Sequence, residues 1–211
     1  SSAQLTVLLT MVLIAHTFPI ELKIAQKAGV KFGFMLLFRF GCGILFGMLL
    51  SFIYSTFHVL QEPVHLSKTF MVQDPSWKAW ILNELKNYLI IICIIFSLIL
   101  AMRILEMTGF MRRINQALHP IIKSLGISEE VLPITIIGLT LGIAYGGGLV
   151  IEESRQKQLK PKDIFYSLIL MGLFHSIFED TLLMLGMGGH YSGVIIFRFI
   201  MAFIITFVIV R

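Results

Sequence analysis

Long stretches of this chain carry almost no charge, and this pattern limits the fold more than any other feature. From Ile164 to the last residue, the charged side chains are those of Glu179, Asp180, Arg198 and Arg211. A helix that crosses a lipid bilayer needs about 20 consecutive, mostly apolar residues. Charged residues make up 14% of the chain, against about 25% in a soluble domain. We therefore expect an all-α polytopic membrane protein and exclude a water-soluble domain.

The hydropathy pattern predicts apolar segments of which about five should span the bilayer as helices. They cover residues 3–18, 32–57, 88–105, 131–151, 164–187 and 191–210. The longest polar connection is 58–86, which we expect to be an external loop with Trp77 and Trp80 at the membrane interface. Residues 109–126 have apolar side chains at helical spacing, which predicts an amphipathic helix at the lipid headgroups, kinked or split at Pro120.

The fourth segment, 131–151, is unusually rich in glycine. Its glycines are Gly138, Gly142, Gly146, Gly147 and Gly148. Each of them weakens a helix by about 1 kcal/mol relative to alanine. One interpretation is a spanning helix that uses glycine to approach its neighbours closely. The other is a broken or re-entrant helical hairpin, which membrane proteins tolerate where protein or a cavity covers the free backbone groups.

The two ends of the chain repeat each other when the sequence is shifted by 159 residues without gaps. The matched pairs include histidines, hydroxyl groups, carboxylates, glycines and arginines. These pairs are His16 with His175, Thr17 with Ser176, Glu21 with Asp180, Gly29 with Gly188 and Arg39 with Arg198. Apolar residues match easily by chance, whereas a histidine and an arginine within apolar segments do not. We infer an internal repeat of two helix pairs.

The charge of the loops indicates how these repeats cross the membrane. Basic residues are concentrated in 20–31, 103–128 and 152–163, whereas the 181–190 turn has no lysine or arginine. Because cytoplasmic loops carry an excess of Lys and Arg, the three basic regions should face the cytoplasm and the turn should face outward. This arrangement requires 131–151 to turn back instead of crossing. The repeats then have opposite orientations, an arrangement that recurs in transporters with discontinuous helices.

The fifth segment contains the polar run from His175 to Asp180. On a continuous helix, His175 and Glu179 would share one face, and Ser176 and Asp180 would form a neighbouring pair. Ionisable groups inside a bilayer are costly, so they should face a polar cavity or each other. The alternative is a helix that ends at Glu179 in the wet interface, but residues 181–187 are apolar again. We expect a buried functional cluster.

We expect this cluster to contact a solute or a coupling cation, together with residues from the other repeat and from the glycine-rich segment. These additional candidates are His16, Thr17, Glu21, Thr140 and Tyr145. The glycines at 138, 142 and 146–148 would expose backbone groups where the helix is broken. Arg39 and Arg198 would either snorkel to an interface or pair with a helix terminus or a carboxylate.

Two kinds of chemistry compete with this interpretation. His175 and Glu179 could ligate zinc, with His16 as a third ligand, but no cysteine lies nearby and no second His–carboxylate pair is visible, so we expect no metal. An enzyme is the third hypothesis. On a helix the side chains of His175 and Ser176 diverge and cannot form a nucleophile–base contact. We therefore expect neither catalysis nor a cofactor.

One family resemblance rests on two adjacent motifs. The run Gly142-Ile-Ala-Tyr-Gly-Gly-Gly-Leu-Val-Ile-Glu-Glu153, followed by a basic loop and His175-Ser-Ile-Phe-Glu-Asp-Thr181, resembles bacterial membrane proteins with the nucleoside recognition, or Gate, domain. It covers about residues 85–211 and reaches the N-terminal end through the repeat. The family is related to gate regions of concentrative nucleoside transporters and ferrous-iron permeases, and to spore maturation membrane proteins. The resemblance implies helical hairpins, broken helices and a transport-like architecture, but the proline- and cysteine-containing gate pattern of the iron permeases is missing.

These observations predict three regions: an N-terminal repeat pair at 1–57, the loop at 58–86 and a Gate-like domain at 87–211 that includes the C-terminal repeat pair 160–211. The leading hypothesis is a small-solute transporter, or transporter-like gate protein, for nucleosides or related molecules in the bacterial cytoplasmic (inner) membrane. The alternative is a membrane assembly or structural protein. Because concentrative nucleoside transporters are larger, we expect a homodimer. The net charge of +5 is spread over short loops, which indicates contact with the lipid bilayer and not with nucleic acid.

Overall fold

The structure is a computed structural model that describes residues 1–64, 76–143, 148–149, 151–152 and 159–211. Within these residues the chain forms helices and no strand, as the hydropathy pattern predicts. The helices are α1 (Ser2–Ile14), α2 (Phe18–Lys27), α3 (Phe32–Thr56), α4 (Trp77–Met107), α5 (Phe110–Ser124), α6 (Leu132–Leu141), α8 (Pro161–Leu173), α9 (Glu179–Gly186), the π-helix η2 (Ser192–Phe197) and α10 (Arg198–Val210).

Four helical stretches among the described residues are long and apolar enough to cross a membrane. They are Ser2–Lys27, Phe32–Thr56, Trp77–Leu105 and Ser192–Val210. The first of them joins α1 and α2 across a short break. The fifth predicted segment, 164–187, is interrupted in the same way between α8 and α9. The expectation of one continuous helix there was wrong, because hydropathy does not register a break whose backbone groups are satisfied by side chains from elsewhere in the fold.

The internal repeat extends to the helix boundaries. Shifting α1 by 159 residues gives the bounds of α8, from Ser2 to Pro161 and from Ile14 to Leu173. Each of these short helices packs on a long one, α1 on α3 and α8 on α10. Small residues permit the close approach of α1 and α3, since a Cβ atom at Gly47 would overlap the side chain of Met11. Each repeat is therefore a broken helix packed against a longer, continuous stretch.

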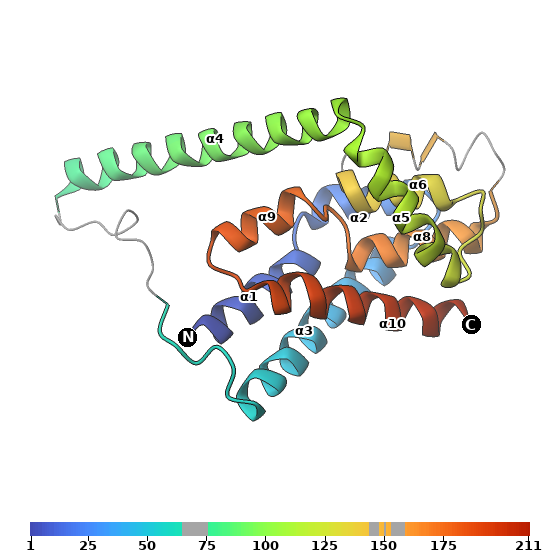
Figure 1. Cartoon of the computed structure of the whole chain (residues 1–211), viewed down its shortest axis with the longest axis horizontal. Helices are drawn as coiled ribbons and strands as arrows, with labels where there is room; N and C mark the ends of the chain where they lie inside the picture. The colour runs from blue at the N-terminus through green and yellow to red at the C-terminus, as the bar shows by residue number, and fades with distance from the viewer. Residues whose placement is uncertain (65–75, 144–147, 150, 153–158) are drawn as a thin grey trace.

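Helix α4 lies along one side of the molecule and is set apart from the helices that gather around α1, α3, α8 and α10 (Figure 1). Nothing in the spanning window of α4 is buried inside the chain, so its apolar side chains are available to lipid. The helix begins at Trp77, earlier than the start at residue 88 that hydropathy predicts. Residues 77–86 are therefore helical rather than loop, and Trp77 and Trp80 are exposed near the start of α4.

Two shorter helices complete the described fold. Helix α5 is continuous through Pro120, so the amphipathic segment is not split there, since a single proline removes only one backbone hydrogen bond. Helix α6 has 10 residues and is about 15 Å long, half of the roughly 30 Å hydrocarbon core. It ends at Gly142, where φ is 90°. Whether the segment then turns back depends on residues 144–147 and 150, which lie outside the described part of the chain.

Candidate functional site

The site is built on two equivalent breaks, one between α1 and α2 and one between α8 and α9. At each break one residue adopts the left-handed conformation, Thr17 with φ 50° and Ser176 with φ 47°. For residues other than glycine such a conformation costs about 1–3 kcal/mol. The last carbonyls of α1 and α8 also lose their helical partners. In an apolar environment each unsatisfied carbonyl costs several kcal/mol, so donors must come from elsewhere.

Arg39 of α3 supplies those donors at the first break. Its Nε donates to the carbonyl of Ile14 at 2.9 Å, and its Nη2 donates to the carbonyl of His16 at 3.3 Å. Its Nη1 donates to Glu21 Oε2, at the start of α2, at 2.5 Å. The arginine is fully buried. It therefore caps the C-terminal end of one half-helix, where a cation is favoured, and pairs with a carboxylate on the other half.

Arg198 of α10 does the same at the second break, with one difference. Its Nε donates to the carbonyl of Leu173 and its Nη2 to that of His175, both at 3.0 Å. The carboxylate in the position of Glu21 is Asp180, which is one methylene shorter, and Arg198 Nη1 is buried without a hydrogen-bond partner. Both arginines are thus bound at helix termini rather than snorkelling to an interface, and Arg198 keeps an unused donor.

The acidic residues of each repeat contact the histidine of the other, and we refer to these contacts as the crosswise pairs. His16 Nε2 lies 3.2 Å from Asp180 Oδ2, and His175 Nε2 lies 3.2 Å from Glu21 Oε1. The two imidazole rings stack with their centroids 5.1 Å apart and an interplanar angle of 19°. The predicted residues His16, Glu21, His175 and Asp180 therefore form one cluster where the two repeats meet.

The backbone fixes which nitrogen of each imidazole carries hydrogen. His16 Nδ1 lies 3.0 Å from the carbonyl of Val12, and His175 Nδ1 lies 2.8 Å from the carbonyl of Met171. A carbonyl oxygen only accepts, so both Nδ1 atoms must be protonated. In a neutral imidazole the Nε2 atom then holds a lone pair, and this lone pair faces a carboxylate. Two acceptors at 3.2 Å need a cation between them, either a proton or a metal ion.

The break changes the roles expected of the 175–180 run. His175 lies in the break and Glu179 is the first residue of α9, so they do not share a helix face, and that expectation was wrong. Glu179 is half-buried, and the His175 ring is directed to Glu21 instead. The argument against an enzyme from adjacent positions on a helix also fails, because Ser176 is not helical. The absence of enzymatic activity stays a prediction.

Helix α6 is joined to the second break. The amide of Ile177 donates to the carbonyl of Leu139 at 3.0 Å, which satisfies one of the free carbonyls at the end of α6. Gly142 lies against Ser176, and a Cβ atom at this glycine would overlap the hydroxyl oxygen of Ser176. Gly138 faces Met171 in the same manner. Two of the predicted glycines therefore allow α6 to contact the break directly.

The other predicted site residues are less closely connected to the cluster. Thr140 is buried, and its hydroxyl donates to the carbonyl of Ile136 within α6 at 2.8 Å. Thr17 is exposed, and a Cβ atom at Gly148 would have no neighbour within 4 Å. Tyr145, Gly146 and Gly147 lie outside the described residues.

The sequence contains a signal that locates the first break. Pro19 follows His16 and Thr17, and proline is favoured in the first turn of a helix because it lacks a backbone N–H. The structure has Pro19 at the start of α2. Transferring this boundary through the repeat would have placed the second break at His175 and Ser176. The capping role of the arginines could then have been inferred as well.

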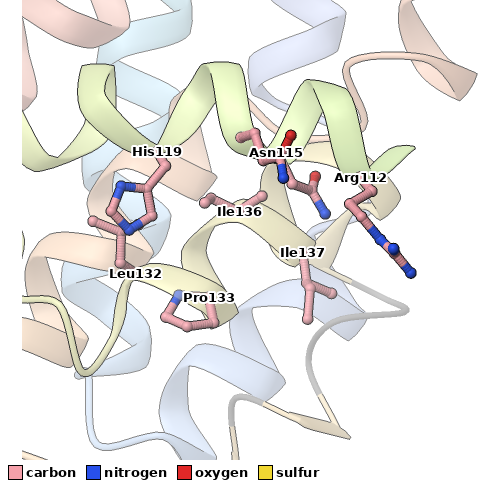
Figure 2. A pocket seen from close by; sticks show the side chains of 8 residues that line it. Arg112, Asn115, His119, Leu132, Pro133, Ile136 and Ile137 are labelled. Atoms are coloured by element: carbon pink, nitrogen blue, oxygen red, sulfur yellow. The ribbon is translucent and has the colours of Figure 1, made fainter. Parts of the chain in front are cut away.

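A cavity of about 500 Å³ lies between α5 and α6 (Figure 2). Helix α5 contributes polar side chains, and α6 contributes an apolar face. The lining residues are Arg112, Asn115, Gln116, His119, Leu132, Pro133, Ile136 and Ile137. Cavities that bind small molecules have volumes of about 300–1,000 Å³ and place a few polar groups on an apolar wall. The sequence analysis did not include these α5 residues among the site candidates.

Comparison with known proteins identifies the chain as similar to a membrane protein. It is 23% identical over 213 residues to the uncharacterized membrane protein YvoD of Bacillus subtilis, in an alignment that covers 99% of this chain and 68% of that protein. No protein-family model matches the chain, and no solved structure matches it. Together with the apolar helices, the similarity shows a membrane protein. The resemblance to the nucleoside recognition family stays a prediction.

Proposed function

We propose that the chain is a multi-pass transporter of the bacterial cytoplasmic membrane that moves a small polar solute past the cluster at the two breaks. One observation carries the proposal: the crosswise pairs, in which His16 contacts Asp180 and His175 contacts Glu21 at 3.2 Å each. The groups come from apolar stretches at opposite ends of the chain. Ionisable residues inside a membrane are rare and commonly mark the path of a substrate or ion.

The arrangement of the helices supports the same function. Secondary transporters often have repeats whose discontinuous helices meet near the middle of the bilayer, with substrate and ion sites at the interface between repeats. Here two broken helices meet at their breaks, with the ring of His16 stacked on that of His175. A change in the angle between the repeats would alter both crosswise pairs at once. The inverted orientation that alternating access needs is a prediction from loop charge.

The cavity between α5 and α6 is the proposed place where the solute first binds. Its volume of about 500 Å³ suits a molecule of nucleoside size. Pro133 and Ile137 of its wall belong to the same half-helix whose other end contacts Ser176. Movement of α6 would therefore connect the cavity to the second break. Nucleosides are the first solutes to test, because the motifs around Gly142 and His175 resemble the nucleoside recognition domain.

Uptake into proteoliposomes tests the proposal. Purified protein would be reconstituted and supplied with radiolabelled nucleosides, nucleobases and small carboxylates. We expect uptake of at least one of them by the wild type and its loss in Asp180→Asn, which weakens a crosswise pair. Glu179→Gln is the matched control, because Glu179 is adjacent but half-buried and outside the crosswise pairs. No uptake of any solute by correctly folded protein would contradict the transporter.

A membrane assembly protein is the second candidate, and one feature favours it. Arg39 spends all its donors inside the chain, on two carbonyls and on Glu21, as expected of groups that hold helices together. In that case the variants would lose folded protein without a separate defect in ligand response. We also propose a homodimer in either case, which light scattering of the protein in detergent would test.

A further inference from the structure

We propose that the cluster at the two breaks binds a divalent transition-metal ion, with Zn²⁺ as the best match. The ligands are His16 Nε2, His175 Nε2 and the Asp180 carboxylate, and Glu21 lies beside them. This proposal goes beyond transport, because an ion at this position would bind whether it is cargo, a coupling ion or a structural element. The sequence analysis expected no metal because it saw one His–carboxylate pair, whereas the fold supplies a second pair from the other repeat.

The spacing of the ligand atoms fits one ion. The atoms of His16, His175 and Asp180 all lie within 4.8 Å of one another. Asp180 Oδ2 is 3.2 Å from His16 Nε2 and 3.9 Å from His175 Nε2. Ligand atoms in a tetrahedral zinc site, with bonds of about 2.0–2.1 Å, are separated by about 3.4 Å. Small rotations of these side chains therefore bring all three atoms to binding distance.

Both imidazoles are held in the form that a metal ion requires. Their Nδ1 atoms donate to the carbonyls of Val12 and Met171, which leaves each Nε2 lone pair directed into the cluster. A second-shell hydrogen bond from the other ring nitrogen to a backbone carbonyl is the usual way in which a protein orients a metal-binding histidine. His175 Nε2 is also fully buried without a hydrogen-bond partner, as expected of a nitrogen reserved for a ligand.

The carboxylates complete the donor set. Arg39 occupies one oxygen of Glu21, and the other oxygen faces His175, so Glu21 is placed to act as a fourth ligand or to support His175. Two imidazoles with carboxylates suit zinc and related transition metals, whereas magnesium and calcium prefer oxygen ligands alone. The side chains of His16 and Asp180 are each 21% exposed. That side of the site is open to water or to an anionic solute.

Direct metal binding tests the proposal without any transport measurement. Tag-free, metal-stripped protein in detergent would be dialysed against Zn²⁺, and Co²⁺ would serve as a visible spectroscopic probe. We expect one ion per chain and a tetrahedral Co²⁺ spectrum that Zn²⁺ abolishes. His16→Ala, His175→Ala and Asp180→Asn should each weaken binding by at least about 100-fold. His58→Asn is the control, since His58 is exposed in a left-handed conformation that asparagine tolerates.

Two results would overturn the metal site: no stoichiometric binding by folded wild-type protein, or binding that all three variants retain. If His175→Ala does not fold, X-ray absorption of the wild-type zinc complex decides, because a first shell without two imidazoles contradicts the assignment. The two proposals fail separately. Metal binding without uptake of any solute removes the transporter, and uptake without metal binding removes the metal site.

Discussion

Glu21 and Asp180 occupy equivalent positions in the two repeats, and the single methylene between them changes what each carboxylate does. Glu21 reaches both Arg39 and His175. Asp180 contacts His16 and leaves Arg198 Nη1 without a partner. Glu21 is 4% exposed and Asp180 is 21% exposed. The first repeat therefore has the more completely paired, structural half of the cluster, and the second has the more open half.

This difference predicts unequal costs of neutralising the two acids. Glu21→Gln should lower the free energy of unfolding by about 3–5 kcal/mol, because it leaves Arg39 buried without a carboxylate. Asp180→Asn should cost about 1–2 kcal/mol, since its arginine already lacks that partner. Denaturant unfolding in detergent, followed by tryptophan fluorescence, gives both values. Equal losses, or a larger loss for Asp180→Asn, would contradict the assignment of a structural and an open half.

Sequence reasoning identified most of the cluster at this scale, because His16, Glu21, His175 and Asp180 share one register of the repeat. It assigned His175 the wrong partner. The pairing with Glu179 assumed helix spacing, and no local pattern in 164–187 shows that the helix stops at Leu173. Arg39 and Arg198 were recognised as unusual, but their capping role depends on free carbonyls that only the breaks create.

At the scale of elements, the contact between α6 and the second break is the feature that sequence patterns described least. The glycine-rich composition of 131–151 correctly indicated an irregular segment. Gly142 has φ 90° and touches Ser176, a contact between positions far apart in sequence that periodicity does not encode. Helix α4 shows the same limit, because the charged residues of 77–86 hid the first turns of a helix.

The contact between Gly142 and Ser176 gives an element-scale prediction. Gly142→Ala should destabilise the fold by about 1–3 kcal/mol, since alanine is strained at φ 90° and its Cβ overlaps the Ser176 hydroxyl. Adding Ser176→Gly should restore part of the loss by removing the overlap. Gly41→Ala is the control, because a Cβ at this α3 position meets nothing within 4 Å.

Thermal unfolding of the four proteins, wild type included, separates the two terms. The double variant should lie between Gly142→Ala and the wild type, and Gly41→Ala should equal or slightly exceed the wild type. If Gly142→Ala unfolds like Gly41→Ala, α6 does not contact the break as described.

At the scale of the whole molecule, the account depends on how the two repeats are oriented in the bilayer. The repeat register predicted the bounds of α8 from those of α1, and it brought both histidines together. Orientation rests on loop charge, with lysines at 23, 27 and 31 in the first repeat and no lysine or arginine in the 181–190 turn. If both turns lie on one side, the repeats are parallel and a rocking motion of inverted repeats is not available.

Cysteine accessibility in intact bacterial cells measures this orientation most directly. Single cysteines would replace Lys27, Lys123, Lys162 or Met187 in a background that lacks Cys42 and Cys93. All four positions are exposed. Met187 is preferred to Gly189, where a Cβ atom would lie 2.9 Å from the carbonyl oxygen of Met184. Unfolding temperatures of the four variants would confirm that each retains the fold.

With a membrane-impermeant maleimide, we predict that the cysteine at position 187 is labelled in intact cells. The cysteines at 27, 123 and 162 should be labelled only after lysis. That pattern places the equivalent ends of α2 and α9 on opposite sides of the membrane and makes the repeats inverted. Labelling at 27 and 187 from the same side would show parallel repeats and would contradict the proposed alternating-access transporter.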